Sequence, residues 1–309
     1  MTPHGHIPVL ENEVARALSP RPGQTYADCT AGLGGHAALI AANVAPGGRV
    51  VLNDVDPGNL EAAAARVREV APGVEVMTIR GNFAELPHHL RGMGVRADLV
   101  LADLGFSSNQ MENAERGLSF MRDGPLDMRL DPTLPTTAAD LVASLPEVEL
   151  ARLIAEYGED KHARRIAARI VRARGEGPIT TTGRLAEVVR SANGGVGGGG
   201  IDPATRTFQA LRIAVNDELG CLEALMAHVE AEARAMAEGN PGGWLTRGGR
   251  VAVITFHSLE DRVVKASFER CEGLGCTDVL GGAAEASEGE RGSNPRSRSA
   301  KVRCVEMPR

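Results

Sequence analysis

The residue types best suited to chemistry form a short run, Asp103-Leu-Gly-Phe106-Ser-Ser-Asn-Gln110, directly after an apolar segment. In open α/β sheets, ligands bind beyond the carboxyl ends of the strands. An acid, a glycine turn and an aromatic at such an edge suit a flat base that carries an amino group. Asp103 would accept a hydrogen bond from the amine, and Phe106 would stack on the ring. The alternative is that Asp103 only caps a turn and that Phe106 is a core aromatic.

A second run, Asp28-Cys-Thr-Ala-Gly32-Leu-Gly34-Gly35-His36, joins an apolar segment to a helical one. Glycines let such a turn pass close to a ligand, and the helix N-terminus that follows favours a negative group such as a carboxylate. Asp54 comes 22 residues after Gly32, at the end of the next apolar segment, where a carboxylate can hold both hydroxyls of a ribose. The same spacing fits a dinucleotide-binding turn, so a nicotinamide cofactor stays open, as does a tight turn without a ligand.

A third candidate is His257, which follows the apolar segment 250–256. It could contact a base or a phosphate, or accept a proton, although a histidine at a strand end is more often a hydrogen-bonded structural residue. Five cysteines are scattered without a CxxC pair, which is typical of reduced thiols in a cytoplasmic protein. Cys271 and Cys276 lack a neighbouring His or Cys pair to complete four ligands, so we predict no metal site.

The elements that must position these residues alternate between strand and helix. Segments 24–29, 49–54, 74–80 and 98–103 are rich in Val, Ile, Leu or Tyr and predict strands. Segments 59–70 and 84–91 predict the helices between them. This alternation indicates a parallel, doubly wound α/β sheet, and the almost continuous apolar character of the strands indicates that both sheet faces are covered.

The alternation stops near residue 109, and only helical segments follow up to residue 202. We therefore predict a first part of the core at 1–108, an inserted helical domain at 109–202 and a second part of the core at 203–309. The six glycines in 194–200 predict a flexible loop. From Pro203 an apolar stripe runs from Phe208 to Val229 at helical spacing, and segments 250–256 and 302–307 predict the last two strands. The segment 123–129 is either a lid over the site or the packed start of the insert.

Composition is that of an ordinary globular protein of 309 residues with 43% hydrophobic residues and a net charge of −6. That charge does not favour a general nucleic-acid binder, but bases are clustered in 161–174 and 291–303, where no acid occurs. We predict RNA contacts at one helix face and in the tail: Arg165, Arg169, Arg172, Arg296, Arg298 and Lys301. A solvated charged face is the alternative. No apolar run is long enough to span a bilayer and no signal peptide is visible, so we expect a cytoplasmic protein without membrane contact.

With these motifs in order along nearly the whole chain, the sequence resembles the RsmH (MraW) family, the bacterial 16S rRNA cytosine-N4 methyltransferases. The Asp103–Phe106 turn is similar to the Asp/Asn-Pro-Pro-Tyr turn of amino-group methyltransferases, with Leu-Gly in place of Pro-Pro. Further matching segments are 6–10, 28–36, 102–110, 115–120, 123–129, 203–210, 256–262 and 294–301.

The resemblance implies a class I methyltransferase (Rossmann-like) core with an inserted all-helical domain. It implies N4-methylation of a decoding-centre cytidine from S-adenosylmethionine, with 16S rRNA as the partner, in the small ribosomal subunit. We predict no protein partner beyond a possible homodimer, and the sequence does not give the oligomeric state. Catalysis would fall to Asp103, Phe106 and His257. Implied cofactor contacts are Gly34, Gly35, His36, Asp54, Phe83, Asp103 and Gln110. Asn53 and Asn109 depart from the family pattern, and neither removes a group that the mechanism needs.

Three other classes stay open at this point. A NAD-dependent oxidoreductase would bind nicotinamide cofactor and ignore S-adenosylmethionine. A non-catalytic RNA-binding ribosome factor would bind RNA without a cofactor. A methyltransferase acting on DNA or a small molecule would not need rRNA.

Overall fold

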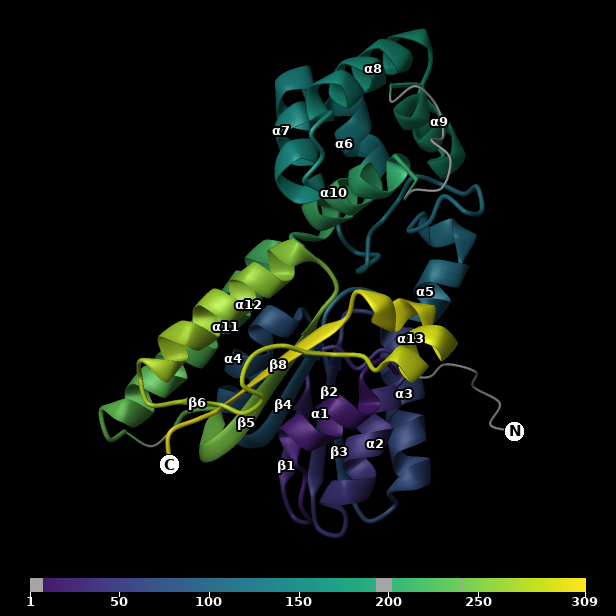
Figure 1. Cartoon of the computed structure of the whole chain (residues 1–309). Helices are drawn as coiled ribbons and strands as arrows, with labels where there is room; N and C mark the ends of the chain where they lie inside the picture. The colour runs from purple at the N-terminus through teal and green to yellow at the C-terminus, as the bar shows by residue number, and fades with distance from the viewer. Residues whose placement is uncertain (1–7, 193–201, 241) are drawn as a thin grey trace. The chain divides into compact units, whose positions relative to one another are not determined.

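The structure is a computed structural model that describes residues 8–192, 202–240 and 242–309. The chain divides into two compact units, Met1–Gly105 with Leu219–Arg309, and Phe106–Glu218. The first contains the sheet and the second is mainly helical (Figure 1). The predicted α/β class is confirmed. The glycine-rich segment 194–200, predicted to be a loop, lies outside the described residues.

The sheet of the first unit has the strand order β3-β2-β1-β4-β5-β8-β6, with β7 paired to β8. The five strands β1 to β5 run parallel, and β8 is antiparallel to β5, β6 and β7. Their bounds are β1 Thr25–Asp28, β2 Arg49–Asp54, β3 Glu75–Arg80, β4 Ala97–Asp103, β5 Leu245–Thr255, β6 Thr277–Asp278, β7 Ala284–Glu285 and β8 Lys301–Glu306. The parallel strands place the ends of β1, β2, β4 and β5 at one edge, where the candidate residues follow them.

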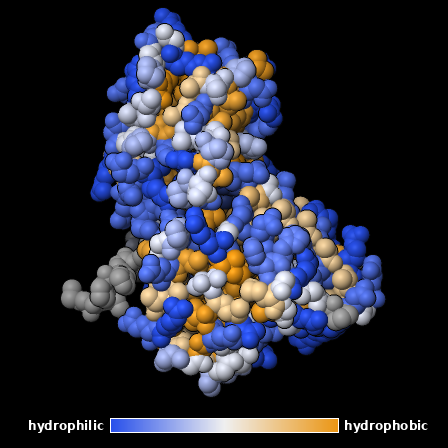
Figure 2. Space-filling model, turned by 180° about the vertical axis from the view of Figure 1, so that it is seen from behind, coloured by the Kyte–Doolittle hydropathy of each residue, from blue (hydrophilic) through white to orange (hydrophobic). Residues whose placement is uncertain are grey.

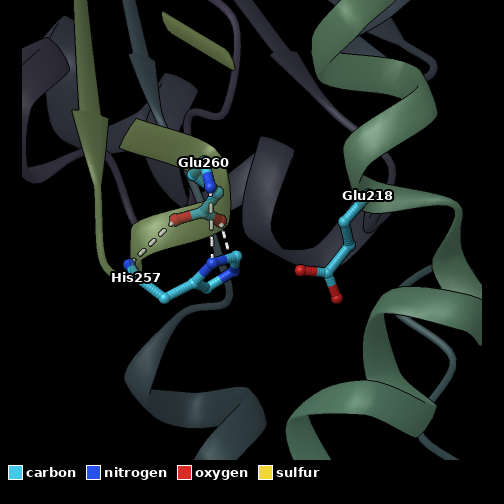
Figure 3. A group of neighbouring side chains, drawn as sticks. All are labelled: Glu218, His257 and Glu260. Carbon is cyan, nitrogen blue, oxygen red and sulfur yellow. Dashed lines mark hydrogen bonds and ion pairs between the residues drawn. The ribbon is translucent and has the colours of Figure 1, made fainter. Parts of the chain in front are cut away.

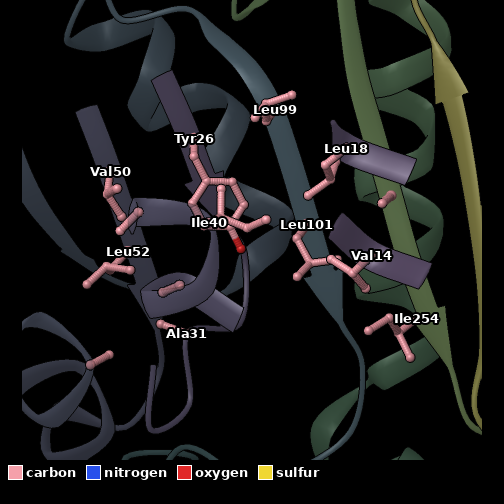
Figure 4. Packing of buried hydrophobic residues seen from close by; sticks show 14 of the residues in the cluster. Val14, Leu18, Tyr26, Ala31, Ile40, Val50, Leu52, Leu99, Leu101 and Ile254 are labelled. Carbon is pink, nitrogen blue, oxygen red and sulfur yellow. The ribbon is translucent and has the colours of Figure 1, made fainter. Parts of the chain in front are cut away.

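Helices cover both faces of this sheet, as the continuous apolar strands predict. One face packs against α1 Glu11–Leu18, α2 Gly35–Val44 and α3 Pro57–Val70. The other packs against α4 Leu86–Gly92, α11 Glu218–Ala237 and α12 Ser258–Glu272. A short helix, α13 Glu288–Ser293, precedes β8. Side chains alternate along each strand between the two cores. Tyr26 and Val50 belong to the core with α1, α2 and α3 (Figure 4). Ala27 and Val51 belong to the core with α4, α11 and α12.

The second unit consists of α5 Ser108–Glu112, α6 Ala138–Ser144, α7 Glu147–Gly158, α8 Ala163–Glu176, α9 Thr182–Ala192 and α10 Ala204–Asn216. These helices bury an apolar core of their own. Leu126 and Met128 are 1% exposed in that core, which favours the packed alternative for segment 123–129. Figure 2 shows a mostly hydrophilic surface over this unit on the visible face. None of the helices in the described ranges combines the length and apolarity that a membrane span requires.

The far boundary of the helical unit differs from the one expected from the sequence. The apolar stripe that begins at Phe208 predicts one helix, which the sequence places in the second part of the core from residue 203 onward. The structure breaks it at Asp217, whose φ of 49° is left-handed, and thereby separates α10 from α11. Phe208 packs in the helical unit and Met226 packs against the sheet, so the second unit extends to Glu218. A regular spacing of apolar residues does not reveal that the two halves of the stripe pack in different cores.

The strands differ from the expected bounds mainly in the second half of the sheet. Strand β5 begins at Leu245, five residues earlier than predicted, and its pairing with β4 shifts register between Ala97 and Leu99. Gly248, with φ of 68°, lies within β5 and not before it. The two-residue strands β6 and β7 were not predicted, because two residues are too few to give a period.

Candidate active site

Asp103 is the last residue of β4, at the edge where the parallel strands end. Its backbone N–H donates to Thr30 Oγ1 at 2.7 Å, so the turn after β1 fixes the end of β4. The carboxylate oxygen Oδ2 lies 3.8 Å from His36 Nε2, in the first turn of α2. Its other oxygen, Oδ1, is buried and has no hydrogen-bond partner among the described residues. A buried acceptor without a partner is costly, so this oxygen is suited to a ligand donor.

The charge state of Asp103 is strongly perturbed. Burial of the carboxyl group, followed by the negative charge of Asp28 and that of Glu260, raises its pKa to about 7, although Arg296 acts in the opposite direction. The side chain nevertheless keeps 28% of its surface exposed, so a ligand can reach it. A carboxyl group with this pKa can both accept a hydrogen bond and take up a proton near neutral pH.

Asp28 ends β1, the strand that pairs with β4, and is only 2% exposed. Its oxygens accept hydrogen bonds from Tyr26 Oη at 2.8 Å and from the Thr30 N–H at 3.1 Å. Burial raises the pKa of Asp28 to about 6 in spite of these two donors. This second acid therefore disfavours the charge on Asp103 without being open to solvent itself.

Asp54 ends β2 and is 9% exposed. Its Oδ2 accepts the Gly32 N–H and its Oδ1 accepts the Asp56 N–H, both at 2.8 Å. Burial raises its pKa, and the two backbone donors partly oppose this rise. The Asn59 side chain also hydrogen-bonds to this carboxylate, so three donors use its acceptor positions in this structure. Contact of Asp54 with a pair of ribose hydroxyls stays a prediction.

The glycines of the first turn are needed for packing within the protein. Gly34 has φ of 76°, and a Cβ there would lie 2.7 Å from the Cα of Ala63 in α3. A Cβ on Gly35 would overlap Pro8 Cγ. Both positions thus require glycine in the absence of any ligand, a reason that differs from the close ligand approach expected from the sequence.

Asn53 has a role that its departure from the family pattern did not reveal. It is 1% exposed, and its Nδ2 donates to the Cys29 carbonyl at 2.8 Å and to the Gly81 carbonyl at 3.0 Å. The side chain therefore ties the end of β1 to the end of β3. Phe83 follows Gly81 in a short 3₁₀ turn and packs, partly buried, against the core beside α4. It keeps an exposed part for the adenine contact that the family resemblance implies.

His257 caps α12 in this structure. Its Nδ1 lies 3.4 Å from the Glu260 N–H, while Glu260 Oε2 accepts the Phe256 N–H at 2.8 Å (Figure 3). Its Nε2 lies 3.2 Å from Glu260 Oε1. An Nδ1 that accepts a hydrogen bond places the ring proton on Nε2. These contacts match the structural alternative for His257, and they leave its catalytic role a prediction.

Two predicted site residues, Phe106 and Gln110, belong to the helical unit. The Phe106 ring packs against the core of that unit, and the Arg212 guanidinium carbon lies 4.9 Å from its centroid. Gln110 is 5% exposed, and its side chain accepts the Ser107 N–H at 3.1 Å as part of the cap of α5. Stacking by Phe106 and cofactor contact by Gln110 stay predictions.

The predicted basic face lies on α8. Arg165 and Arg172 are exposed, and Arg172 pairs with Glu176 at 3.4 Å. Arg169 is half-buried and donates to Ser191 Oγ at 2.9 Å. Where α8 begins, the surface has an open hollow of about 510 Å³, lined by Ala155, Asp160, Lys161, His162, Ala163, Arg164 and Arg165. Three of these side chains are permanently cationic, which suits a phosphate better than a neutral ligand.

The tail bases are placed differently from one another. Lys301 Nζ lies 3.6 Å from Glu285 Oε1, and exposed Arg298 donates to the Arg291 carbonyl at 3.3 Å. Arg296 is half-buried, and its charge acts on Asp103. Sequence reasoning therefore assigned Arg296 only an RNA contact and missed the buried Glu260, although both influence the pKa of Asp103. The match of segments 256–262 and 294–301 to one family was the signal that could have found them.

Comparisons with known proteins agree with the motif pattern. The MraW methylase family matches residues 3–308. Ribosomal RNA small subunit methyltransferase H of Geobacter sulfurreducens is 46% identical over 319 residues, covering 97% of this chain and 98% of that protein. The protein of the same name from Symbiobacterium thermophilum is 47% identical over 319 residues, covering 97% and 96%. Among solved structures, Aeropyrum pernix fibrillarin with natively bound S-adenosyl-L-methionine aligns at 11% identity and a TM-score of 0.38, over 95% of this chain and 74% of that one.

Proposed function

We propose, because this chain belongs to the MraW methylase family, that it methylates the exocyclic N4 amine of a decoding-centre cytidine in 16S ribosomal RNA. At the coarser level, the chain is an S-adenosylmethionine-dependent methyltransferase of ribosomal RNA. The oxidoreductase and the non-catalytic ribosome factor are therefore set aside. The observation that carries the N4 assignment is the Asp103 carboxylate, partly exposed at the end of β4, with one buried oxygen that has no hydrogen-bond partner within the described part of the chain.

The residues at this edge of the sheet fit the cofactor. S-adenosylmethionine, when bound, supplies an electrophilic methyl group on a sulfonium, so the protein needs little acid–base chemistry to activate it. Asp54, which ends β2 and is oriented by the Gly32 and Asp56 N–H groups, would hold the ribose hydroxyls. Gly34, Gly35 and His36 would line the amino-acid end at the start of α2, and Phe83 would contact the adenine. Asp103 would serve both cofactor and substrate.

Asp103 supplies what the reacting amine lacks. The lone pair of a cytosine amine is delocalised into the ring, so the amine is a poor nucleophile. A carboxylate that accepts a hydrogen bond from N4 orients the amine and favours a more nucleophilic geometry, and such positioning accounts for much of the acceleration in a reaction of this kind. Because the pKa of Asp103 is raised to about 7, the same oxygen can take up the proton that N4 loses.

The RNA would be held by bases away from the reacting atoms. The exposed α8 face of Arg165 and Arg172, with the hollow beside Lys161, supports phosphate contacts. Arg298 and Lys301 belong to the tail group with the same predicted role. We propose that the substrate is 16S rRNA within the small ribosomal subunit. The homodimer stays a prediction.

The test is nucleoside mapping of 16S rRNA from a strain that lacks the gene. We expect N4-methylated cytidine to disappear from one decoding-centre position while other modifications stay. Purified protein with methyl-labelled S-adenosylmethionine should restore the label at that position, and NAD should not replace the cofactor. Asp103→Ala protein, matched in folding by circular dichroism, serves as the control. Label at another atom or nucleotide, or an unchanged map in the deletion strain, would overturn the proposal.

A further inference from the structure

We propose that Arg296 is a positioning residue of the methyl-transfer site, and that its guanidinium keeps the Asp103 carboxylate in its ionised, hydrogen-bond-accepting form. This inference rests on the proposed function, because that function assigns to the Asp103 carboxylate the hydrogen bond from the reacting amine. It departs from the RNA-contact role that the sequence pattern gives to all tail bases. Three observations support it: the strand register, the charges around Asp103 and the different surroundings of the neighbouring bases.

The strand register brings the segment before β8 to the edge that carries Asp103. In the β4–β5 pair, Asp103 is aligned with Ile254, and in the β5–β8 pair, Ile254 is aligned with Val302. Because β8 is antiparallel to β5, its first residues lie where the parallel strands end. Arg296 belongs to a 3₁₀ turn, Pro295–Arg298, that ends just before Lys301. It therefore approaches Asp103 from the far side of β5.

The turn that carries Arg296 is well anchored. Ser297 is fully buried, and its N–H and Oγ both bond to the Asn294 carbonyl, at 3.0 and 2.8 Å. Asn294 in turn donates its N–H to the Glu290 carbonyl at 2.7 Å. The Glu290 carboxylate accepts the Leu10 N–H at 2.7 Å, which ties the turn to α1. Because the Arg296 side chain is half-buried and its backbone is held in an anchored turn, it has few alternative positions, and its charge stays near the sheet edge.

The charges that face Asp103 come from four elements. Asp28 on β1 and Glu260 on α12 disfavour its ionisation, and burial acts in the same sense. His36 on α2 places Nε2 at 3.8 Å from Oδ2. Arg296 is the permanently charged cation that favours the ionised form. Without it, two other carboxyl groups and a buried environment would act on Asp103, and its pKa would rise above the value of about 7.

The neighbouring bases differ from Arg296. Arg298 is exposed and donates to the Arg291 carbonyl, and Lys301 forms an ion pair with Glu285. The main causes of the raised pKa of Asp103 include Arg296 but neither of these two bases. Arg298 is thus a matched control, since it lies in the same turn, carries the same charge and shares the predicted contact with RNA.

The first experiment measures Asp103 directly, without cofactor or RNA. Protein labelled with ¹³C at aspartate carboxyl groups is titrated by NMR in the wild type, Arg296→Gln, Arg296→Lys and Arg298→Gln, with Asp103→Asn used for assignment. We expect a pKa near 7 in the wild type and a rise of about one unit in Arg296→Gln, the size of shift that one nearby charge produces. Arg296→Lys should restore most of the difference, and Arg298→Gln should match the wild type. Equal values in Arg296→Gln and wild type would overturn the proposal.

The second experiment measures single-turnover methyl transfer to small-subunit 16S rRNA between pH 5.5 and 9.5, at saturating S-adenosylmethionine and RNA. A rise of about one unit lowers the ionised fraction at pH 7 from about a half to about a tenth, so Arg296→Gln should be about fivefold slower there. Its rate should approach that of the wild type at high pH. If the single-turnover rate falls by the same factor at every pH and RNA affinity is weaker, Arg296 is a phosphate contact and the inference is overturned. An inactive wild type with the NMR shift intact would instead count against the proposed function alone.

Discussion

Gly34→Ala tests the packing of the turn between β1 and α2. The position has φ of 76°, where an alanine is disfavoured by about 1–2 kcal/mol. The new Cβ would also lie 2.7 Å from Ala63 Cα and 3.2 Å from its carbonyl oxygen, which are backbone atoms of α3 and cannot rotate away. Overpacking of this kind costs about 1–3 kcal/mol. We therefore expect a loss of about 2–5 kcal/mol in the free energy of unfolding.

Gly47→Ala is the matched control, because Gly47 has φ of 77° and a Cβ there would meet nothing within 4 Å. It should show only the cost of the left-handed backbone. Urea unfolding followed by far-ultraviolet circular dichroism gives both free energies, provided the m-values agree. If Gly34→Ala loses no more stability than Gly47→Ala, the contact with α3 does not constrain this turn, and the packing account of Gly34 is refuted.

Four further predictions concern the site and its surroundings. Asp54→Ala should weaken S-adenosylmethionine binding by about 1.5–3 kcal/mol in calorimetry, with a smaller effect on turnover at saturation; unchanged affinity in folded protein would remove Asp54 from the cofactor site. Asp103→Ala should slow single-turnover transfer by about 10² or more, and Asp103→Asn by less; a rate within a few-fold of wild type would exclude Asp103 from the chemical step. Because the folded-state pKa of Asp28 is raised to about 6, the folded protein binds the extra proton, so stability should fall by at most about 3 kcal/mol as the pH rises from 4 to 7. Asp28→Asn should flatten that fall in urea titrations, and an unchanged slope would contradict the assignment. Glutamine at Arg165, Arg169 and Arg172 together should weaken the salt dependence of RNA binding and leave cofactor affinity unchanged. If the slope of the binding constant against salt concentration does not change, this face of α8 is only solvated.

Strands β1, β2 and β4 could be predicted from the sequence because they are buried on both faces. The predicted strand 49–54 has the same bounds as β2, and the predicted strand 98–103 begins one residue later than β4. Each strand ends at a polar residue that marks the sheet edge, so Asp54 and Asp103 could be placed correctly at strand ends. Periodicity suffices where burial is uniform along an element.

The rest depended on contacts between residues distant in sequence. Helix α10 ends where the apolar stripe of residues 208–229 passes from the core of the helical unit to the core beside the sheet. The spacing of apolar residues does not show which core each half packs against. Asn53 reads as a departure from a pattern, yet its two carbonyl partners are 24 and 28 residues away. His257 reads as a site residue by its motif, while its contacts are those of a helix cap with Glu260. The sequence pattern predicts one role for the tail bases, and only their surroundings in the fold distinguish half-buried Arg296 from exposed Arg298.

Strand β8 has a consequence for biosynthesis. It lies between β5 and β6 in the sheet, and its first residues position the turn that faces Asp103. While residues 301–306 are still inside the ribosome, β5 has one unpaired edge, and such an edge invites association with other chains. The pairing of Ile254 with Val302 also closes late and over a long loop, which slows folding. A chain that lacks residues 301–306 would therefore be prone to aggregate through the unpaired edge of β5.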